Sequence, residues 1–390
     1  MSPRSRRNAV SFFNVMVVGF SGVGKTSFIK TLMAALKNET PKDKRESFGS
    51  QTPDSNALAG PLTKTQKPYT VSAGIDVDGE KVMLTVIDTP GFQSDYLIDK
   101  QLHDILGYIE HQFDLTLAEK QGGYSEESKV KRNPKAVDTQ VHACLYVIDP
   151  TKRALDQYDI RILTRLSERV NVIPVIGKAD TLTLAQRRRF KPMILRDIYT
   201  NQKIPLYGMP EDEEDDDEEE EEKEDENDKE KETNGTKEGQ GSGASDTNGN
   251  DSNDNSTKAK TTSTLDDFLN QFNYEEEDEE TQAFLDYLKL IPFNVIAYED
   301  EPETGEPIEM EGIKIGRDYG WGKIDCLSDD TSDFNSLKTM LLSTHRRILQ
   351  SETVERYYEQ YRTERLLIKR ATKLKSMDVG KKLLDDLKRV

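Results

Sequence analysis

The chain has 390 residues, of which 73 are acidic and 54 are basic, and its formal net charge is −19. Residues 211–232 hold 18 acidic side chains against three lysines, so the rest of the chain is near neutral and can bind phosphates. No apolar run approaches the roughly 20 residues that span a bilayer. Two cysteines and four scattered histidines exclude a disulfide framework and a zinc cluster. The first residues lack an apolar stretch of signal-peptide length, so we expect a cytoplasmic protein.

Strands and helices are predicted to alternate along the chain. Short runs of apolar, often β-branched residues predict strands, and the amphipathic stretches between them predict helices. The predicted strands are residues 15–18, 81–87, 141–148, 170–176 and 293–297, and the predicted helices are residues 26–36, 97–113, 156–168, 184–199, 266–272 and 281–290. This alternation indicates an α/β fold with a doubly wound, mostly parallel sheet.

Residues 211–264 interrupt this pattern. They are first acidic and then rich in Gly, Ser, Asn, Asp and Thr, a composition typical of disorder, and they hold almost no apolar side chain to bury. Because a strand returns at residue 293, we interpret the tract as an insertion loop within one domain.

Two helices, residues 334–349 and 352–375, are predicted in the C-terminal third of the chain. Residues 365–390 carry nine basic and three acidic side chains, and charges on the apolar seam argue against a coiled coil. The alternatives are a solvated helix packed on the domain, a partner-binding helix and a helix at a membrane surface.

A phosphate-binding loop follows the first predicted strand. Residues 19–26, Gly-Phe-Ser-Gly-Val-Gly-Lys-Thr, fit G-x-x-x-x-G-K-[ST] in full and lie between a strand and a helix. In such a loop, backbone N–H groups surround the phosphates, the lysine reaches the β- and γ-phosphates, and the last hydroxyl ligates Mg²⁺. The predicted nucleotide-binding residues of this segment are Gly19, Ser21, Gly22, Val23, Gly24, Lys25, Thr26 and Ser27.

An Asp-Thr-Pro-Gly sequence, residues 88–91, ends the second predicted strand. An aspartate at the carboxyl end of a strand opposite a phosphate-binding loop can hold Mg²⁺ through water. Asp88 is therefore predicted as a metal ligand, and Gly91 is predicted to offer its backbone N–H to a γ-phosphate.

A Gly-Lys-Ala-Asp sequence, residues 177–180, follows the fourth predicted strand. The Asp180 carboxylate can accept both N–H groups of a guanine edge, and the Lys178 stem can pack on the purine. Adenine lacks that pair of donors, which argues against an ATP-dependent enzyme. Each of the three motifs lies at the carboxyl end of a strand in one parallel sheet, so we expect all three to line the same crevice. The sequence therefore predicts that this crevice binds GTP or GDP with Mg²⁺.

With these motifs the chain resembles the septins, a family of filament-forming guanine-nucleotide-binding proteins. The resemblance extends over residues 12–366 apart from the acidic insertion, and Arg132-Asn133-Pro134 favours the fungal subgroup found at rod ends. The segments that carry it are the phosphate-binding loop and residues 84–92, 108–113, 170–176, 178–183, 291–293, 321–322, 333–334 and 361–366.

The resemblance also implies how the chain is divided. The expected parts are a basic N-terminal segment (1–11), a septin-type G domain (12–308) interrupted by the disordered acidic insertion, a septin-specific α+β element (309–366) and a basic helical tail (367–390).

Septins assemble through two alternating surfaces, one of which contains the nucleotide. By position, His142 and Trp321 match residues that line this surface, and Arg317 matches the arginine that stacks on guanine. Ala297 stands where the guanine pocket usually has a glycine. The alternative for Trp321 is that it packs inside its own domain.

Catalytic septins use a switch threonine to hold water and Mg²⁺. Counting back from Asp88 places this residue at Thr65, with Thr63 and Thr70 as alternatives if the spacing contains a gap. Residues 152–155, Lys-Arg-Ala-Leu, replace the usual Gly-His-Gly-Leu, and Gln93-Ser94-Asp95 follows Phe92 where Gly-Asp is usual. Together with Ala297, these departures from the family pattern imply a divergent nucleotide-containing surface with slow or absent hydrolysis.

The expected function is that of a scaffold subunit in cytokinesis and cell division, located in the cytoskeleton at the cell cortex, septum or bud neck. Its expected partners are other septin subunits in hetero-oligomeric rods and filaments, and no nucleic acid. Arg4, Arg6 and Arg7 stand where the family carries a basic patch, so anionic membrane lipids are a further expected partner. The alternative is a monomeric switch-type GTPase with real turnover.

Overall fold

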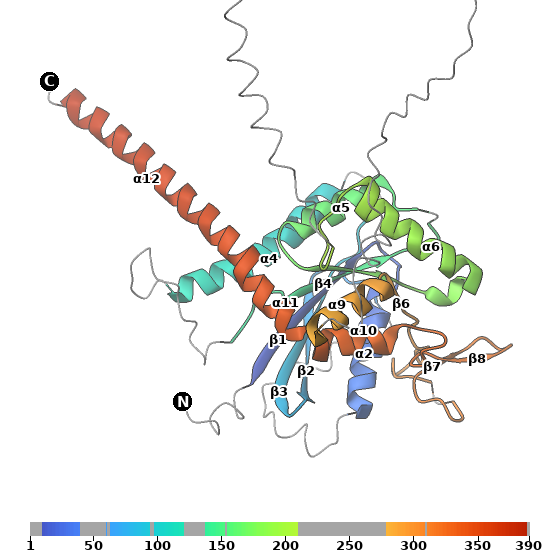
Figure 1. Ribbon diagram of the computed structural model, residues 1–390. Helices are drawn as coiled ribbons and strands as arrows, with labels where there is room; N and C mark the ends of the chain where they lie inside the picture. Colours follow the sequence, from blue (N-terminus) through green and yellow to red (C-terminus); the bar gives the residue numbers. More distant parts are fainter. Residues whose placement is uncertain are drawn as a thin grey trace, which may run out of the picture. The chain divides into compact units, whose positions relative to one another are not determined.

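The computed structural model describes residues 10–39, 60, 63–93, 97–120, 137–152, 154–209, 278–308 and 310–387. The acidic insertion, the N-terminal arginines and the predicted helix at 266–272 lie outside these residues. The described residues form a six-stranded sheet between helices and a separate two-stranded sheet (Figure 1).

The strand order of the large sheet is β2-β3-β1-β4-β5-β6, and every strand in it is parallel to its neighbours except β2, which runs antiparallel to β3. The register places Gly19 beside Val147 and Val17 beside Asp88, so the loops that follow β1, β3 and β4 leave the same edge. The strands are β1 (Ser11–Gly19), β2 (Tyr69–Val77), β3 (Glu80–Asp88), β4 (Ala143–Ile148), β5 (Val172–Ile176) and β6 (Phe293–Asn294).

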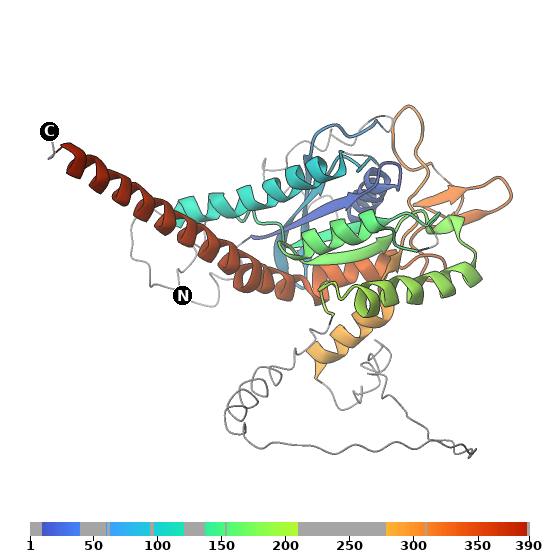
Figure 2. The same ribbon diagram turned by 90° about the horizontal axis from the view of Figure 1, so that it is seen from above.

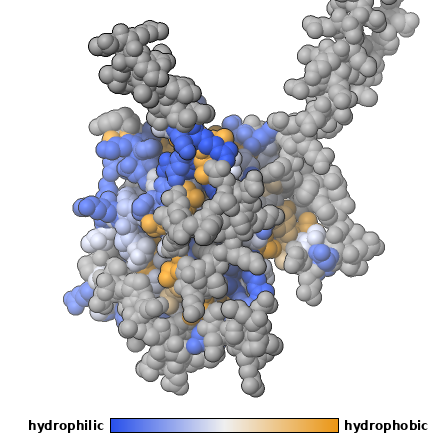
Figure 3. All heavy atoms as spheres, turned by 90° about the vertical axis from the view of Figure 1, so that its left-hand side faces the viewer, coloured by the Kyte–Doolittle hydropathy of each residue, from blue (hydrophilic) through white to orange (hydrophobic). Residues whose placement is uncertain are grey.

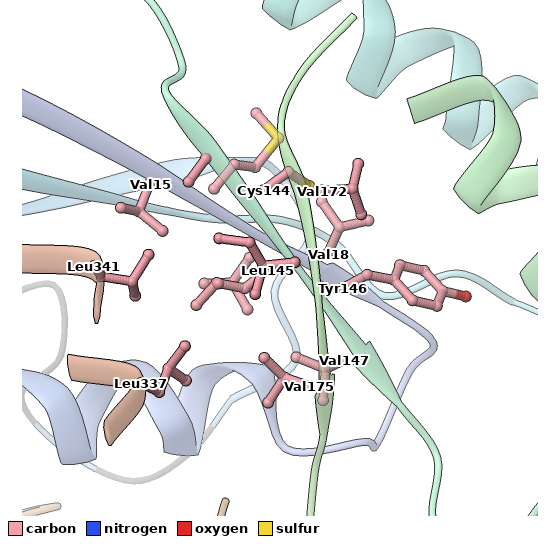
Figure 4. Packing of buried hydrophobic residues seen from close by; sticks show 14 of the residues in the cluster. Val15, Val18, Cys144, Leu145, Tyr146, Val147, Val172, Val175, Leu337 and Leu341 are labelled. Carbon is pink, nitrogen blue, oxygen red and sulfur yellow. The ribbon is translucent and has the colours of Figure 1, made fainter. Parts of the chain in front are cut away.

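Helices cover both faces of this sheet, and for that reason every side chain of β4 and β5 is buried. Helices α2 (Lys25–Glu39) and α10 (Phe334–Thr339) lie on one face, and α4 (Ile98–Lys120) and α5 (Gln157–Ser167) lie on the other (Figure 2). Figure 4 shows the core between these layers, where Leu337 and Leu341 approach Leu145 and Val175 of the central strands. The structure thus confirms the predicted α/β fold with a doubly wound sheet.

The strands differ from the sequence-based elements at both edges of the large sheet and at residues 316–325, where two short strands were not predicted. Strand β2 was not predicted because it lies at the edge of the sheet and mixes polar with apolar residues, so its pattern is neither continuous nor alternating. Strand β6 is shorter than the predicted 293–297 and ends at Asn294, although the next N–H, of Val295, still donates to the Ile176 carbonyl. The remaining helices before the C-terminal part are α6 (Leu184–Arg196) and α9 (Glu279–Leu290).

The C-terminal part begins with a hairpin, β7 (Gly316–Asp318) and β8 (Lys323–Asp325). A nearly continuous helical run follows, with α10, α11 (Arg346–Glu352) and α12 (Glu359–Leu387) joined by π-helical turns. Ion pairs hold the start of α12 on the domain: Arg169 pairs with Glu364 at 2.7 Å, and Arg365 pairs with Asp114 of α4 at 2.8 Å. Of the three alternatives for this helix, these contacts favour packing on the domain for its first turns.

Among the described residues, none of the helices has the length and apolar character needed to cross a membrane. On the face shown in Figure 3, the described side chains are largely hydrophilic, and apolar side chains occur in scattered spots.

Candidate functional site

The phosphate-binding loop has the backbone that its glycines predict. Gly22 and Gly24 have φ values of +87° and +100°, which side-chain-bearing residues rarely adopt. A Cβ at Gly19 would lie 2.5 Å from the Val147 carbonyl oxygen, so only glycine allows β1 and β4 to approach each other here. Val23 is buried beneath the loop, and Ser27 lies in the first turn of α2.

Lys25 begins helix α2 and is 6% exposed. Its Nζ donates hydrogen bonds to the carbonyl oxygens of Gly19 at 3.0 Å and Phe20 at 2.9 Å. Burial lowers the pKa of Lys25 to about 8, and the charge of Asp88 only partly offsets this effect. The site therefore holds a costly buried cation that a phosphate would stabilise.

Four oxygen-bearing side chains meet beside this loop: those of Thr26, Thr65, Asp88 and Tyr69, whose hydroxyl interacts with Asp88 and Thr26. The Asp88 Oδ2 accepts hydrogen bonds from Thr26 Oγ1 at 2.7 Å and from Thr65 Oγ1 at 3.1 Å, and the two hydroxyl oxygens are 3.4 Å apart. Asp88 is fully buried, and its Oδ1 has no hydrogen-bond partner among the described residues. A carboxylate with hydroxyl groups is a hard oxygen donor set that suits Mg²⁺.

Of the three candidate threonines, the one beside Asp88 is Thr65. The exposed Thr63 and Thr70 have no hydrogen bond to Asp88 among those described, whereas Thr65 does. The segment that carries Thr65 is tied to the rest of the domain through Gly60, whose N–H donates to the Thr304 carbonyl at 3.0 Å.

Lys30, one helical turn after Thr26, holds the same segment. Its Nζ donates to the Gly60 carbonyl at 3.1 Å and forms a buried ion pair with Asp300 at 2.9 Å. A Cβ at Gly305 would lie 2.1 Å from the Gly60 carbonyl oxygen, so the turn at 304–305 packs closely on Gly60.

Phe92 pairs with the phosphate-binding loop through an isolated bridge to Phe20, and Gly91 packs against the same loop. The Phe92 N–H donates to the Gly19 carbonyl at 3.1 Å, and the Ser21 N–H donates to the Phe92 carbonyl at 2.9 Å. A Cβ at Gly91 would lie 2.5 Å from Ser21 Cα and 2.9 Å from Lys25 Nζ. This position tolerates no side chain in the structure described.

Replacing Gly91 with alanine is therefore expected to destabilise the fold. The added methyl would meet the Ser21 backbone, which cannot move aside as a flexible side chain can, so the unfolding free energy should fall by about 1–3 kcal/mol. Urea denaturation measures this change. The matched control is Gly107→Ala in α4, where a Cβ meets nothing within 4 Å and alanine should be neutral or stabilising. Equal stability of the two variants would contradict the steric argument.

The Gly-Lys-Ala-Asp loop lies directly beside the phosphate-binding loop. A Cβ at Gly177 would be 2.4 Å from the Val23 carbonyl oxygen, and the Lys178 stem lies 3.7 Å from the Cβ position of Gly24. The Ala179 N–H donates to the Val295 carbonyl at 3.1 Å, which holds the loop to the segment after β6. Ala297 lies on that segment and is partly buried.

Asp180 meets the β7–β8 hairpin. Its side chain is 8% exposed, and its Oδ2 accepts a hydrogen bond from the Tyr319 hydroxyl at 2.5 Å. Arg317 Nη1 lies 4.0 Å from the same oxygen. Tyr319 was missed in the sequence, because it lies in the turn between β7 and β8, where no strand or helix period predicts which way a side chain points.

The expectation that His142 lines the nucleotide-containing assembly surface is wrong. His142 directly precedes β4, at the opposite end from the loops described above, and is 0% exposed. Its Nδ1 accepts from the Asn14 N–H at 3.0 Å, so Nε2 carries the proton and donates to Asp138 at 3.2 Å. The ring also stacks on Phe13. A side chain sealed in this polar cluster cannot line an assembly surface.

Trp321 lies at the tip of the β7–β8 hairpin and is 82% exposed. The alternative that it packs inside its own domain is therefore wrong. Its ring stacks on that of Tyr319, with centroids 5.3 Å apart.

The fold and the motifs at the carboxyl edge of the sheet define a P-loop protein of the G-domain class. Residues 10–231 and 254–375 match the family model described as Septin, which is more than half of the chain, and the chain belongs to the septin family.

Two curated fungal relatives are about equally similar to this chain. Septation protein 7 of Candida albicans is 31% identical over 386 residues, covering 91% of this chain and 48% of the relative. Cell division control protein 11 of Saccharomyces cerevisiae is 30% identical over 354 residues, covering 91% of this chain and 66% of the relative. The chain thus spans about half of the first relative and about two thirds of the second. The names of these relatives connect them with septation and cell division.

The crystal structure of a septin GTPase domain from Chlamydomonas reinhardtii has a TM-score of 0.50 and 20% identity, and the match covers 91% of this chain and 99% of that structure. This likeness supports the fold.

Proposed function

We propose that this chain is a septin subunit that binds GTP or GDP at the carboxyl edge of its sheet and assembles with other septin subunits into filaments. The convergence of three different groups carries the proposal. Lys25 supplies a buried cation for phosphates, Asp88 with two threonines supplies oxygen ligands, and Asp180 supplies the acceptor for a guanine edge.

Thr26 and Asp88 would hold Mg²⁺, with Thr65 as a third oxygen near them. Two observations support this assignment: Asp88 Oδ1 has no hydrogen-bond partner among the residues that the structure describes, and two hydroxyl groups lie beside this carboxylate. When bound, Mg²⁺ supplies charge that neutralises the phosphates. The protein side chains position the phosphates and the metal ligands, with Lys25 as the cation of the phosphate-binding loop.

The assembly part of the proposal rests on family membership and on Trp321. An exposed tryptophan beside the base site is the kind of residue that anchors an interface. We place the subunit in cytokinesis and cell division, at the cell cortex, septum or bud neck, with nucleotide serving mainly a structural role. Binding to anionic lipids through the N-terminal arginines, the position at rod ends and the division into parts at 11, 308 and 366 belong to the same proposal.

One observation favours a second candidate function, a switch-type GTPase with turnover. Thr65 is within 3.1 Å of Asp88, as a threonine that holds water and metal would be. The scaffold function implies tightly held nucleotide with slow exchange, whereas a switch implies repeated release of phosphate.

The test of the proposal is the nucleotide bound by the purified protein and its base preference. We expect guanine nucleotide in the wild-type protein, and we expect Asp180→Asn to weaken GDP binding by roughly 10- to 100-fold while improving binding of xanthosine diphosphate, because an amide exchanges one acceptor for a donor. Asp104→Asn, at an exposed position in α4, is the matched control and should leave GDP binding unchanged. Equal affinity of the wild-type protein for ADP and GDP would overturn the proposal.

A further inference from the structure

The Asp180 carboxylate, which we propose binds the guanine base, already has a hydrogen-bond partner within the chain. The Tyr319 hydroxyl donates to Asp180 Oδ2, and Asp180 Oδ1 is buried without a hydrogen-bond partner in the part of the chain that the structure describes. The carboxylate that guanine would need is therefore covered on the side of the β7–β8 hairpin.

The hydroxyl and a guanine edge make the same kind of bond. Guanine offers two N–H donors, which together use both oxygens of a carboxylate, whereas Tyr319 offers one donor to one of them. Burial, together with the neighbouring Asp180, raises the pKa of Tyr319 above its ordinary value, so the hydroxyl keeps its proton and remains a donor at any working pH. The Tyr319 hydroxyl and one N–H group of guanine therefore compete for Asp180 Oδ2.

The ring of Tyr319 connects this competition to the outer surface of the hairpin. The Arg317 guanidinium lies 5.7 Å from the ring centre, and the ring stacks on Trp321 at an interplanar angle of 27°. Because the turn between β7 and β8 carries both aromatic rings, a rotation of the Tyr319 side chain away from Asp180 would change its contact with Trp321.

We propose that Tyr319 gates the base site: guanine binds when it displaces the Tyr319 hydroxyl from Asp180, and this displacement rearranges the Tyr319–Trp321 stack at the exposed hairpin. The inference rests on the proposed binding of guanine nucleotide. Coupling of this kind is reciprocal. A partner that binds Trp321 and draws Tyr319 away from Asp180 raises the affinity for nucleotide, and bound nucleotide raises the affinity for that partner by the same factor.

The first test is Tyr319→Phe, which removes only the competing hydroxyl. We expect it to bind GDP at least about tenfold more tightly than the wild-type protein in calorimetry, because the base no longer replaces a hydrogen bond to a charged group. Tyr158→Phe, on the exposed face of α5, is the matched control and should bind GDP as the wild-type protein does.

The second test uses the single tryptophan of the chain as a reporter. Saturating GDP should change the emission of Trp321 in the wild-type protein, at a concentration where sedimentation shows no assembly. Unchanged emission would overturn the coupling to the hairpin.

The outcomes separate this inference from the proposed function. If the wild-type protein binds GDP and Tyr319→Phe binds it equally or more weakly, Tyr319 supports Asp180 and the gate is refuted while the proposed function stands. If neither protein binds GDP, both are refuted. If only Tyr319→Phe binds GDP, both are supported.

Discussion

Replacing Lys25 with methionine is expected to abolish nucleotide binding while leaving the folded chain at least as stable as before. The ammonium group is the point charge that a phosphate-binding loop needs, and methionine keeps the length of the stem without the charge. The pKa of about 8, against an ordinary value of 10.5, indicates that the buried charge destabilises the free protein by on the order of 3 kcal/mol. The loss of two hydrogen bonds to carbonyl groups offsets part of this gain.

The sign of the pH dependence follows from the same pKa. Between pH 8 and pH 10.5 the unfolded chain binds the proton more tightly, so the stability of the wild-type protein should rise with pH in this window, and Lys25→Met should lack that rise. Urea denaturation at pH 7 and pH 9.5 measures stability, and calorimetry measures nucleotide binding. Lys37→Met, with a side chain that is 66% exposed, is the control and should change neither quantity. Nucleotide affinity of Lys25→Met within tenfold of the wild-type value would contradict the assignment.

Replacing Trp321 with alanine is expected to leave a folded protein that assembles poorly. Because its side chain is 82% exposed, truncation should change the unfolding free energy by no more than about 0.5 kcal/mol. A tryptophan at the centre of an interface can contribute 2 kcal/mol or more, so association with septin partners should weaken by at least about 30-fold.

Two separate measurements check this prediction: thermal unfolding of the isolated chain and sedimentation of the variant with its septin partners. Leu115→Ala, a truncation at another exposed apolar position, on α4, should behave as the wild-type protein does in sedimentation. A folded Trp321→Ala protein that still forms complexes of full size would remove Trp321 from the assembly surface.

The predictions that agreed with the structure rest on local spacing. The turn from β1 into α2 depends on glycines a few residues apart, and the parallel order of the strands then brings Lys25 and Asp88 to one edge. Thr65 could be counted back from Asp88 because the hairpin of β2 and β3 between them has a short turn.

The predictions that the sequence missed or gave wrongly concern contacts between residues that are far apart in the chain. Asn14 and Asp138 enclose His142, and position along the chain does not reveal that a histidine before a strand is buried in such a cluster. The contact of Tyr319 with Asp180 joins residues 139 positions apart, and no local pattern in the sequence indicates that they meet.

The two halves of the domain that flank residues 210–277 are held together by much more than the peptide chain between them. Strand β5 precedes this tract and β6 follows it, yet the two strands pair in one sheet. The Lys191 Nζ donates to the Leu290 carbonyl, and the Tyr287 hydroxyl donates to the Tyr207 carbonyl. A chain cut by a protease between residues 209 and 278 would therefore remain one particle, and its two fragments would separate only in denaturant.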